Sequence, residues 1–274
     1  MKNLLPRFSR FAVVFLAAAL ALAAHASAQD WAKTILNKSP RHQEWVKVTY
    51  GTRTVNAFVV YPEVSQKTPV ALLIHEIFGL SDWARSMADD IAAMGYIVIA
   101  PDLLSGFGPN GGDTSAFPDT QAAVKAVSGL NADNVNADLN AAADYALKFP
   151  AANGKLAVIG FCWGGGKSFL FTTQRKGLSA AFVFYGPPPP DDTLKSITAP
   201  VYGFYAGNDM RITATVPATK EAMAAAGKKY NAVTYDGADH GFMRAGEDPA
   251  NTDPANATAR AEALKRLETL LKGM

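Results

Sequence analysis

Hydrophobic and polar positions along the chain form two recurring patterns. Short, nearly continuous apolar runs alternate with longer segments in which apolar residues recur at helical spacing. Apolar runs of this length are typical of parallel strands that are covered on both faces by helices. The pattern therefore predicts strands at residues 70–74, 97–100, 156–159, 181–185, 201–205 and 232–235.

Helical patterns separate most of these runs. The predicted helices cover residues 82–94, with a cap near Ser81 and an end at Gly95, and residues 136–149, 216–226 and 258–271. A further helix should begin just after Cys162. This alternation predicts an α/β fold with a mostly parallel, doubly wound sheet, whose ligands bind beyond the carboxyl ends of the strands.

Other segments complete this prediction. Residues 45–50 and 54–61 alternate in polarity around Gly51, which predicts an antiparallel hairpin at the sheet edge. The Gly- and Pro-rich residues 105–118 and 186–192 are expected to be loops on the ligand side of the sheet. Such loops could frame a pocket or could only connect elements.

The first 28 residues form a separate pattern. Lys2, Arg7 and Arg10 precede an apolar stretch of 14 residues, and Ala26-Ser-Ala28 follows as a small-residue cleavage site. This is typical of an export signal peptide, and the stretch is shorter than the roughly 20 residues that span a bilayer. We therefore expect a signal peptide at residues 1–28, cleavage after Ala28, a single domain at residues 29–274, and a periplasmic or secreted protein.

Charge and cysteine usage narrow the function classes. Loss of the leader, with three basic and no acidic residues, changes the formal net charge from +2 to −1, which suggests no nucleic acid or anionic membrane as partner. The histidines are scattered without metal-ligand spacing, so we expect no metal and no cofactor. Cys162 is the single cysteine and cannot form an internal disulfide; it is a buried small side chain, an intermolecular bridge or a functional thiol.

The sequence around this cysteine favours the functional thiol. The strand at residues 156–159 runs into Gly160-Phe-Cys-Trp-Gly164, and a helical pattern follows. This is the form of a nucleophile elbow, with Cys in place of Ser and small residues two positions before and after it. The turn would place the Cys162 thiol at a helix N-terminus, where the helix dipole favours the thiolate and the Trp163 N–H can face an oxyanion.

A nucleophile of this kind needs a base and an orienting carboxylate. Only one histidine follows Cys162, directly after the last predicted strand, so we predict that His240 is the base. Asp209, in the turn after the strand at residues 201–205, is the best candidate for the carboxylate, although it could instead cap that turn. The competing carboxylates lie in a Pro-rich loop or too close to the histidine: Asp191, Asp192, Asp236 and Asp239.

The segment after the first buried strand supplies further candidates. In this architecture it provides the second oxyanion donor, which we assign to the Ile77 N–H. Glu76, next to it, could accept a proton from the thiol or return it. We interpret His75 as a structural, hydrogen-bonded residue.

Together these residues resemble the dienelactone hydrolase family, the carboxymethylenebutenolidases. The resemblance covers nearly all of the chain after the leader and rests on residues 75–80 (HEIFGL), 100–102 (APD), 160–165 (GFCWGG), 207–209 (GND) and 238–242 (ADHGF). It implies a triad of Cys162, His240 and Asp209. It also implies Glu76 as the carboxylate that interacts with the resting thiol, and Ile77 and Trp163 as oxyanion donors.

The resemblance also bears on the substrate. Arg244 stands four residues after His240, where the family has an arginine that binds the substrate carboxylate, and Phe78 is assigned to substrate binding in the same way. The family's other carboxylate-binding arginine has no counterpart, because residues 103–121 contain no basic residue. Export is a second difference, because the catabolic members of the family are usually cytoplasmic.

The expected function is hydrolysis of a small ester or lactone through a thioester acyl-enzyme. One alternative keeps the fold and changes the substrate, as in a general short-chain esterase or thioesterase. The other is a non-catalytic periplasmic binding or thiol-sensing protein. We expect a monomer that acts on a small molecule and does not associate with a membrane once the leader is removed.

Overall fold

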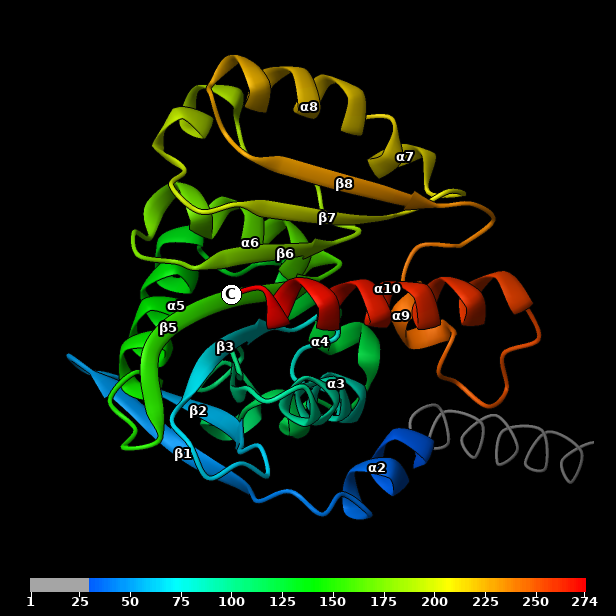
Figure 1. Ribbon diagram of the computed structural model, residues 1–274. Coiled ribbons are helices and arrows are strands. Elements are labelled where there is room, and N and C mark those ends of the chain that lie inside the picture. The colour runs from blue at the N-terminus through cyan, green and yellow to red at the C-terminus, as the bar shows by residue number, and fades with distance from the viewer. Residues whose placement is uncertain (1–29) are drawn as a thin grey trace, which may run out of the picture.

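A computed structural model describes residues 30–274 of the chain (Figure 1). The predicted signal peptide at residues 1–28 lies outside the described residues. Within residues 30–274, no helix is both long and apolar enough to cross a bilayer.

A single sheet of eight strands forms the centre of the described part of the chain. Its strand order is β1-β2-β4-β3-β5-β6-β7-β8, with β1 and β2 antiparallel to their neighbours and the remaining pairs parallel. The strands are β1 (Gln43–Tyr50), β2 (Arg53–Val60), β3 (Thr68–Ile74), β4 (Ile97–Pro101), β5 (Ala152–Phe161), β6 (Ala180–Phe184), β7 (Val201–Ala206) and β8 (Tyr230–Tyr235). The predicted parallel strands and the edge hairpin are confirmed.

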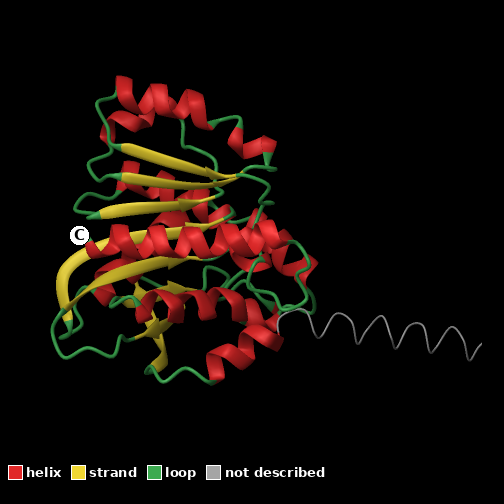
Figure 2. Cartoon of the chain, turned by 45° about the vertical axis from the view of Figure 1, so that its right-hand side comes forward, coloured by secondary structure: helices red, strands yellow, loops and turns green. Residues whose placement is uncertain are grey.

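Helices cover both faces of this sheet (Figures 1 and 2). Side chains of α2 (Asp30–Asn37), α3 (Asp82–Ala93) and α10 (Pro254–Lys272) pack in one apolar core. Side chains of α5 (Ala132–Ala146), α6 (Trp163–Gln174) and α8 (Val216–Ala225) pack in a second core on the opposite face. The continuous apolar runs of the sequence are explained by these two cores, because alternate strand residues enter each of them.

Local capping explains where several helices begin. Ser81 accepts a hydrogen bond from Ala84 N at the start of α3, as predicted. The predicted helix at residues 136–149 begins earlier, at Ala132, because the Asn131 side chain accepts from the amides of residues 133 and 134. The predicted helix at residues 258–271 likewise begins earlier, at Pro254, after the cap Asp253.

The sequence patterns did not predict several short helices. They are α2, α4 (Thr120–Ser128), α7 (Met210–Thr213) and α9 (Phe242–Ala245), with the 3-10 helices η1 (Pro109–Gly111), η2 (Thr114–Ala116) and η3 (Asp191–Ser196). The loop prediction for residues 105–118 therefore has to include two 3-10 turns. Helix α4 packs Ala123 and Val127 against Leu104, Ile77 and Trp163, so it covers the ligand end of the central strands.

Candidate active site

Cys162 stands where β5 ends and α6 begins. Its backbone has φ 57° and ψ −117°, a conformation that residues other than glycine rarely adopt. The turn is tight: a Cβ on Gly160 would lie 2.0 Å from Gly164 O, and one on Gly164 would lie 2.3 Å from His75 O. Both glycines are therefore required by close approach of the backbone, as the elbow pattern predicted.

His240 and Asp209 lie in line with the thiol. His240 Nε2 is 3.0 Å from Cys162 Sγ, and His240 Nδ1 is 2.5 Å from Asp209 Oδ2. Asp209 follows β7 and its side chain is 8 % exposed, whereas that of His240 is 32 % exposed. The structure thus brings the three side chains into one chain of hydrogen-bond contacts, in which Cys162 is partly buried.

The competing carboxylates lie elsewhere. Asp239 Oδ1 accepts a 3.0 Å hydrogen bond from Asn208, and Asp236 is exposed in the turn after β8. Asp191 and Asp192 are exposed in η3. None of these carboxylates has a hydrogen bond to His240 among the described contacts, so Asp209 is the carboxylate that the fold places beside the imidazole.

Two backbone amides point at the sulfur. The N–H groups of Trp163 and Ile77 both donate toward Cys162 Sγ and favour its thiolate. Burial opposes them and is the largest influence, and the negative charge of Glu76 adds to it, so the pKa of the Cys162 thiol is raised. A thiol at rest in this site is therefore predominantly protonated at neutral pH.

Glu76 is buried beneath the thiol. Only 2 % of it is exposed, and its carboxylate accepts a 2.8 Å hydrogen bond from Arg244 Nε. Tyr185 Oη donates to the other carboxylate oxygen at 3.4 Å. Burial raises the pKa of Glu76 and the Arg244 guanidinium counteracts that rise. The charged form of Glu76 is thus favoured by Arg244, by His240 and by the Tyr185 phenol.

Arg244 contacts the buried Glu76 and is also partly exposed to solvent. Its guanidinium carbon lies 4.9 Å from the centroid of the Phe78 ring, and 31 % of its side chain is exposed. The structure therefore places Arg244 over the face of Phe78 and against Glu76, as a cation over an aromatic ring. An anionic group entering from solvent could reach the exposed part of Arg244.

Sequence reasoning missed two residues of this site. Tyr185, with φ 39°, lies just beyond β6, and its ring packs edge-on against His240 at 5.1 Å. Arg211 in α7 lies 3.8 Å from Asp209 and its charge favours the Cys162 thiolate. Tyr185 directly follows β6 and Arg211 lies in the short α7 after β7, but the contacts of both side chains depend on tertiary packing.

His75 is fully buried at the end of β3. Its Nδ1 lies 2.7 Å from Glu76 O, and its ring stacks on Trp163 with centroids 5.6 Å apart. None of the contacts described for His75 involves His240 or Asp209.

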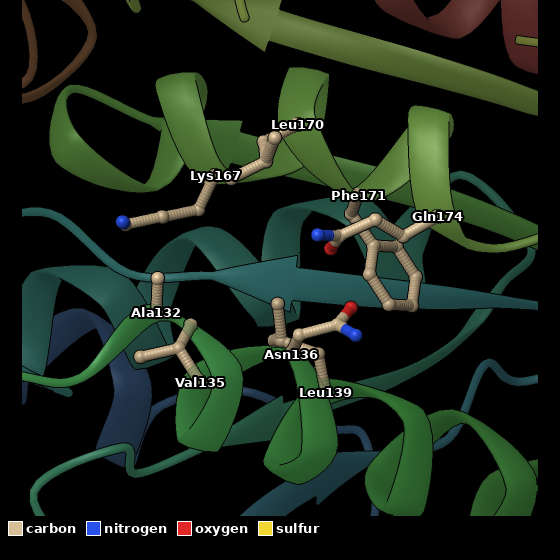
Figure 3. Close-up of a pocket in the computed structure, with 8 residues that line it drawn as sticks. All are labelled: Ala132, Val135, Asn136, Leu139, Lys167, Leu170, Phe171 and Gln174. Carbon is tan, nitrogen blue, oxygen red and sulfur yellow. The ribbon is translucent and has the colours of Figure 1, made fainter. Parts of the chain in front are cut away.

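A small hollow lies between α5 and α6 (Figure 3), lined among others by Val135, Leu139, Lys167 and Phe171. None of the residues around the thiol lines it. Within residues 30–274, no cluster of three or more His, Cys, Asp or Glu side chains is arranged to hold a metal ion. The thiol, imidazole, carboxylates and amides of the described site lie at or just beyond the ends of β3, β5, β7 and β8.

The fold is that of an α/β hydrolase: the sheet is mostly parallel, an elbow joins β5 to α6, and a histidine follows the last strand. Residues 55–274 match the profile of the Dienelactone hydrolase family. The chain therefore belongs to the dienelactone hydrolase family.

Individual relatives agree with this assignment. The chain is 31 % identical to a carboxymethylenebutenolidase-type protein of Methylorubrum extorquens, over 72 % of this chain and 71 % of the relative. It is 30 % identical to a carboxymethylenebutenolidase homolog of Rattus norvegicus, over 73 % and 80 %. The crystal structure of a dienelactone hydrolase-type protein from Klebsiella pneumoniae superposes with a TM-score of 0.70 at 26 % identity, over 82 % of this chain and 97 % of that one.

Proposed function

We propose that this chain hydrolyses small carboxylic esters or lactones with Cys162 as nucleophile, His240 as general base and Asp209 as its orienting carboxylate. The observation that carries the proposal is the row of contacts from Cys162 Sγ to His240 Nε2 at 3.0 Å and from His240 Nδ1 to Asp209 at 2.5 Å. A nucleophile, a base and an orienting group within hydrogen-bond reach are the elements that covalent acyl transfer requires.

In the first half of the reaction, His240 Nε2 takes the thiol proton as Cys162 Sγ attacks the carbonyl carbon. A carbon–sulfur bond forms, and the carbonyl oxygen becomes an oxyanion that the Ile77 and Trp163 amides stabilise. The oxyanion collapses, the carbon–oxygen bond of the ester breaks, and the alkoxide leaves with the proton from His240. In the second half, His240 deprotonates a water molecule that attacks the thioester carbonyl. The carbon–sulfur bond then breaks, the carboxylic acid leaves, and Cys162 Sγ recovers the proton from His240.

Glu76 would keep the enzyme at rest in its thiol form. Its negative charge acts with burial to raise the pKa of Cys162. A neutral thiol is less open to oxidation and alkylation than a thiolate, which matters for a lone cysteine. We propose that Glu76 disfavours the thiolate until substrate enters, and that the thiol proton then passes to His240 as Cys162 Sγ attacks.

The substrate class follows from the relatives and from Arg244. The relatives are named for carboxymethylenebutenolidase, and the partly exposed Arg244 over Phe78 would bind a substrate carboxylate in the same site. Residues 103–121 contribute no basic residue, so Arg244 would lack the second anchor that the family places there. A neutral short-chain ester or thioester is the second candidate, favoured by that missing charge.

Kinetics on a substrate panel tests the proposal. Purified protein is assayed with dienelactones, neutral lactones and short-chain p-nitrophenyl esters, together with the variants Cys162→Ala and His240→Gln. We expect a burst of product that equals the enzyme concentration and a thioester adduct on Cys162 by mass spectrometry. Ester hydrolysis that persists in Cys162→Ala would refute the proposal. Absence of turnover on every ester, with reversible sulfenic acid at Cys162, would favour a thiol sensor instead.

We further propose that residues 1–28 direct export and that residues 29–274 form one domain in the periplasm or outside the cell. The basic start, apolar stretch and Ala26-Ser-Ala28 support this. The intact mass of the protein from a cell fraction tests it, with loss of 28 residues expected; a full-length cytoplasmic protein would contradict it.

A further inference from the structure

His75 contacts both segments that would stabilise the oxyanion, although it lies outside the proposed path of the proton. It is fully buried, and its Nδ1 lies 2.7 Å from Glu76 O. A carbonyl oxygen only accepts, so Nδ1 must carry the proton and donate it. Burial lowers the pKa of the His75 imidazole and outweighs the negative charge of Asp102, which raises it, so the neutral ring is favoured. Among the described residues its Nε2 has no hydrogen-bond partner.

The acceptor of this hydrogen bond belongs to a peptide group that matters for catalysis. The Glu76 carbonyl and the Ile77 N–H are parts of one planar group, and no peptide bond among residues 30–274 is cis. In a trans peptide the C=O and N–H bonds point in opposite directions. The ring of His75 holds the oxygen end, Gly79 N donates to the same oxygen at 3.2 Å, and the Ile77 N–H therefore points at Cys162 Sγ.

The same histidine also contacts the segment of the other amide. Its ring lies nearly parallel to that of Trp163, with 12° between the planes and 5.6 Å between centroids. Its carbonyl oxygen occupies the space that a Cβ on Gly164 would need, at 2.3 Å. His75 thus sits against the elbow with its backbone and against Trp163 with its ring.

A separate set of contacts holds the far end of the loop. Thr114 Oγ1 accepts from Leu80 N at 3.0 Å and donates to the buried Asp102 at 2.7 Å. Asp102 also accepts from the amides of Leu104 and Thr114. With the loop fixed at Leu80 by Thr114, the direction of the Ile77 amide depends on the peptide at its beginning, and that peptide is held by His75.

We infer that His75 is a positioning residue, whose Nδ1–H fixes the Glu76 to Ile77 peptide so that the Ile77 N–H faces the developing oxyanion. The inference rests on the proposed function, because it assigns a role within the acyl transfer of Cys162. The hydrogen bond acts in two ways: it fixes the direction of the N–H, and it polarises the peptide so that the N–H becomes a better donor. Donors aligned before the reaction lower the barrier without reorganisation.

A matched pair of substitutions isolates the donor. His75→Asn keeps a side-chain N–H near the position of Nδ1, whereas His75→Leu has a similar branched shape without any donor. We expect the kcat of His75→Leu to fall by about 10- to 100-fold with little change in KM, less than the roughly 100- to 1,000-fold loss when an oxyanion donor is removed outright. His75→Asn should recover most of this loss. The carbonyl stretch of the acyl-enzyme in infrared spectra should move to higher wavenumber in His75→Leu only.

Equal kcat values and equal carbonyl stretches in the two variants would overturn the inference. Thermal unfolding and stoichiometric alkylation of Cys162 establish that each variant is folded. Hydrolysis that survives in Cys162→Ala would refute the proposed function itself. Wild-type kcat in His75→Leu, with Cys162→Ala inactive, would refute the role of His75 alone.

The unmodified protein provides a measurement that requires no variant to fold. Nitrogen-15 NMR of histidine-labelled protein reports which ring nitrogen of His75 carries the proton. We expect a neutral ring protonated at Nδ1. A ring protonated at Nε2 alone would overturn the inference, because Nδ1 could not then donate to Glu76.

Discussion

The Glu76 carboxylate accepts a 2.8 Å hydrogen bond from Arg244 Nε, with Glu76 buried and Arg244 partly open to solvent. The two residues are far apart in the chain: Glu76 lies just after β3, and Arg244 lies in α9. A buried carboxylate without a partner would be costly, so this ion pair is needed for the charged form of Glu76. The same guanidinium therefore supports an internal charge and faces the solvent side of the site.

Substitution of this arginine should destabilise the protein in a pH-dependent manner. Arg244→Gln should lower the free energy of unfolding by about 2 kcal/mol at pH 8, below the roughly 3–5 kcal/mol for breaking a fully buried pair, because Arg244 is partly exposed. The pKa of Glu76 is already raised by burial and should rise further without Arg244. A carboxyl group with a raised folded-state pKa contributes stability below its unfolded pKa of about 4.3, and this is lost as pH rises through the folded value.

Urea denaturation at pH 5 and pH 8 measures this effect. The loss of stability in Arg244→Gln should be larger at pH 8. Lys272→Gln is the control, because Lys272 pairs with Glu268 at the surface, and an exposed pair contributes about 0–1 kcal/mol. A loss that is equal at both pH values would contradict the electrostatic explanation.

Glu76→Gln should lower the pKa of the Cys162 thiol. The charge of Glu76 raises that pKa, second only to burial, so its removal favours the thiolate. The rate of alkylation by iodoacetamide, measured against pH, should therefore rise at lower pH in the variant than in the wild type. Glu268→Gln, in the exposed pair with Lys272, should leave the profile unchanged. If the alkylation profile of Glu76→Gln shifted to higher pH, the charge of Glu76 could not be what raises the pKa of Cys162.

Asp209→Asn should decrease kcat by up to about 10,000-fold, the effect when an amide replaces the carboxylate of a Ser-His-Asp triad and favours the wrong imidazole tautomer. Steady-state kinetics with a p-nitrophenyl ester measures the loss. Asp239→Asn is the control, since Asp239 is next to His240 in the chain but accepts from Asn208. If Asp239→Asn lost as much activity as Asp209→Asn, the assignment of the orienting carboxylate would be wrong.

Gly164→Ala should destabilise the fold by about 1–3 kcal/mol, the range typical of overpacking a close contact. The added Cβ would lie 2.3 Å from His75 O and 2.4 Å from Ile74 O, so β3 and α6 would have to move apart. Gly129→Ala at the end of α4 is the control, because its Cβ would make only ordinary contacts at 3.5 Å and beyond. Thermal unfolding of both variants gives the comparison; an unchanged melting temperature in Gly164→Ala would show that the elbow is looser than these distances require.

Most of the architecture could be predicted from the sequence, because strands that are buried on both faces have continuous apolar runs. The continuous apolar run before Gly160 could hardly be a surface strand, and the glycines at positions 160 and 164 mark a backbone contact that any side chain would prevent. Helix α4 was missed because it is short and its apolar side chains, alanine and valine, are small. It depends on packing against Leu104 and Trp163, which the local pattern does not contain.

The order of the candidate site residues along the chain could be predicted from the sequence, but most of their contacts could not. His240 could be selected because no other histidine follows Cys162, and Asp209 because it follows the preceding strand. Tyr185 could not be selected in this way, because tyrosines at strand ends are common and only the positive φ turns its hydroxyl toward Glu76. The contact between Arg244 and Glu76 likewise depends on how α9 is oriented.

The left-handed backbone at Cys162 has a consequence for the molecule as a whole. A non-glycine residue with φ 57° and ψ −117° holds about 1–3 kcal/mol of strain. The surrounding β5 and α6 must be rigid enough to prevent relaxation of that bend. Replacement of Cys162 by glycine should consequently give a protein that is more stable to unfolding but has no hydrolase activity. Mutations distant from the sulfur that weaken the packing of β5 or α6 should lower the activity by allowing the bend to relax.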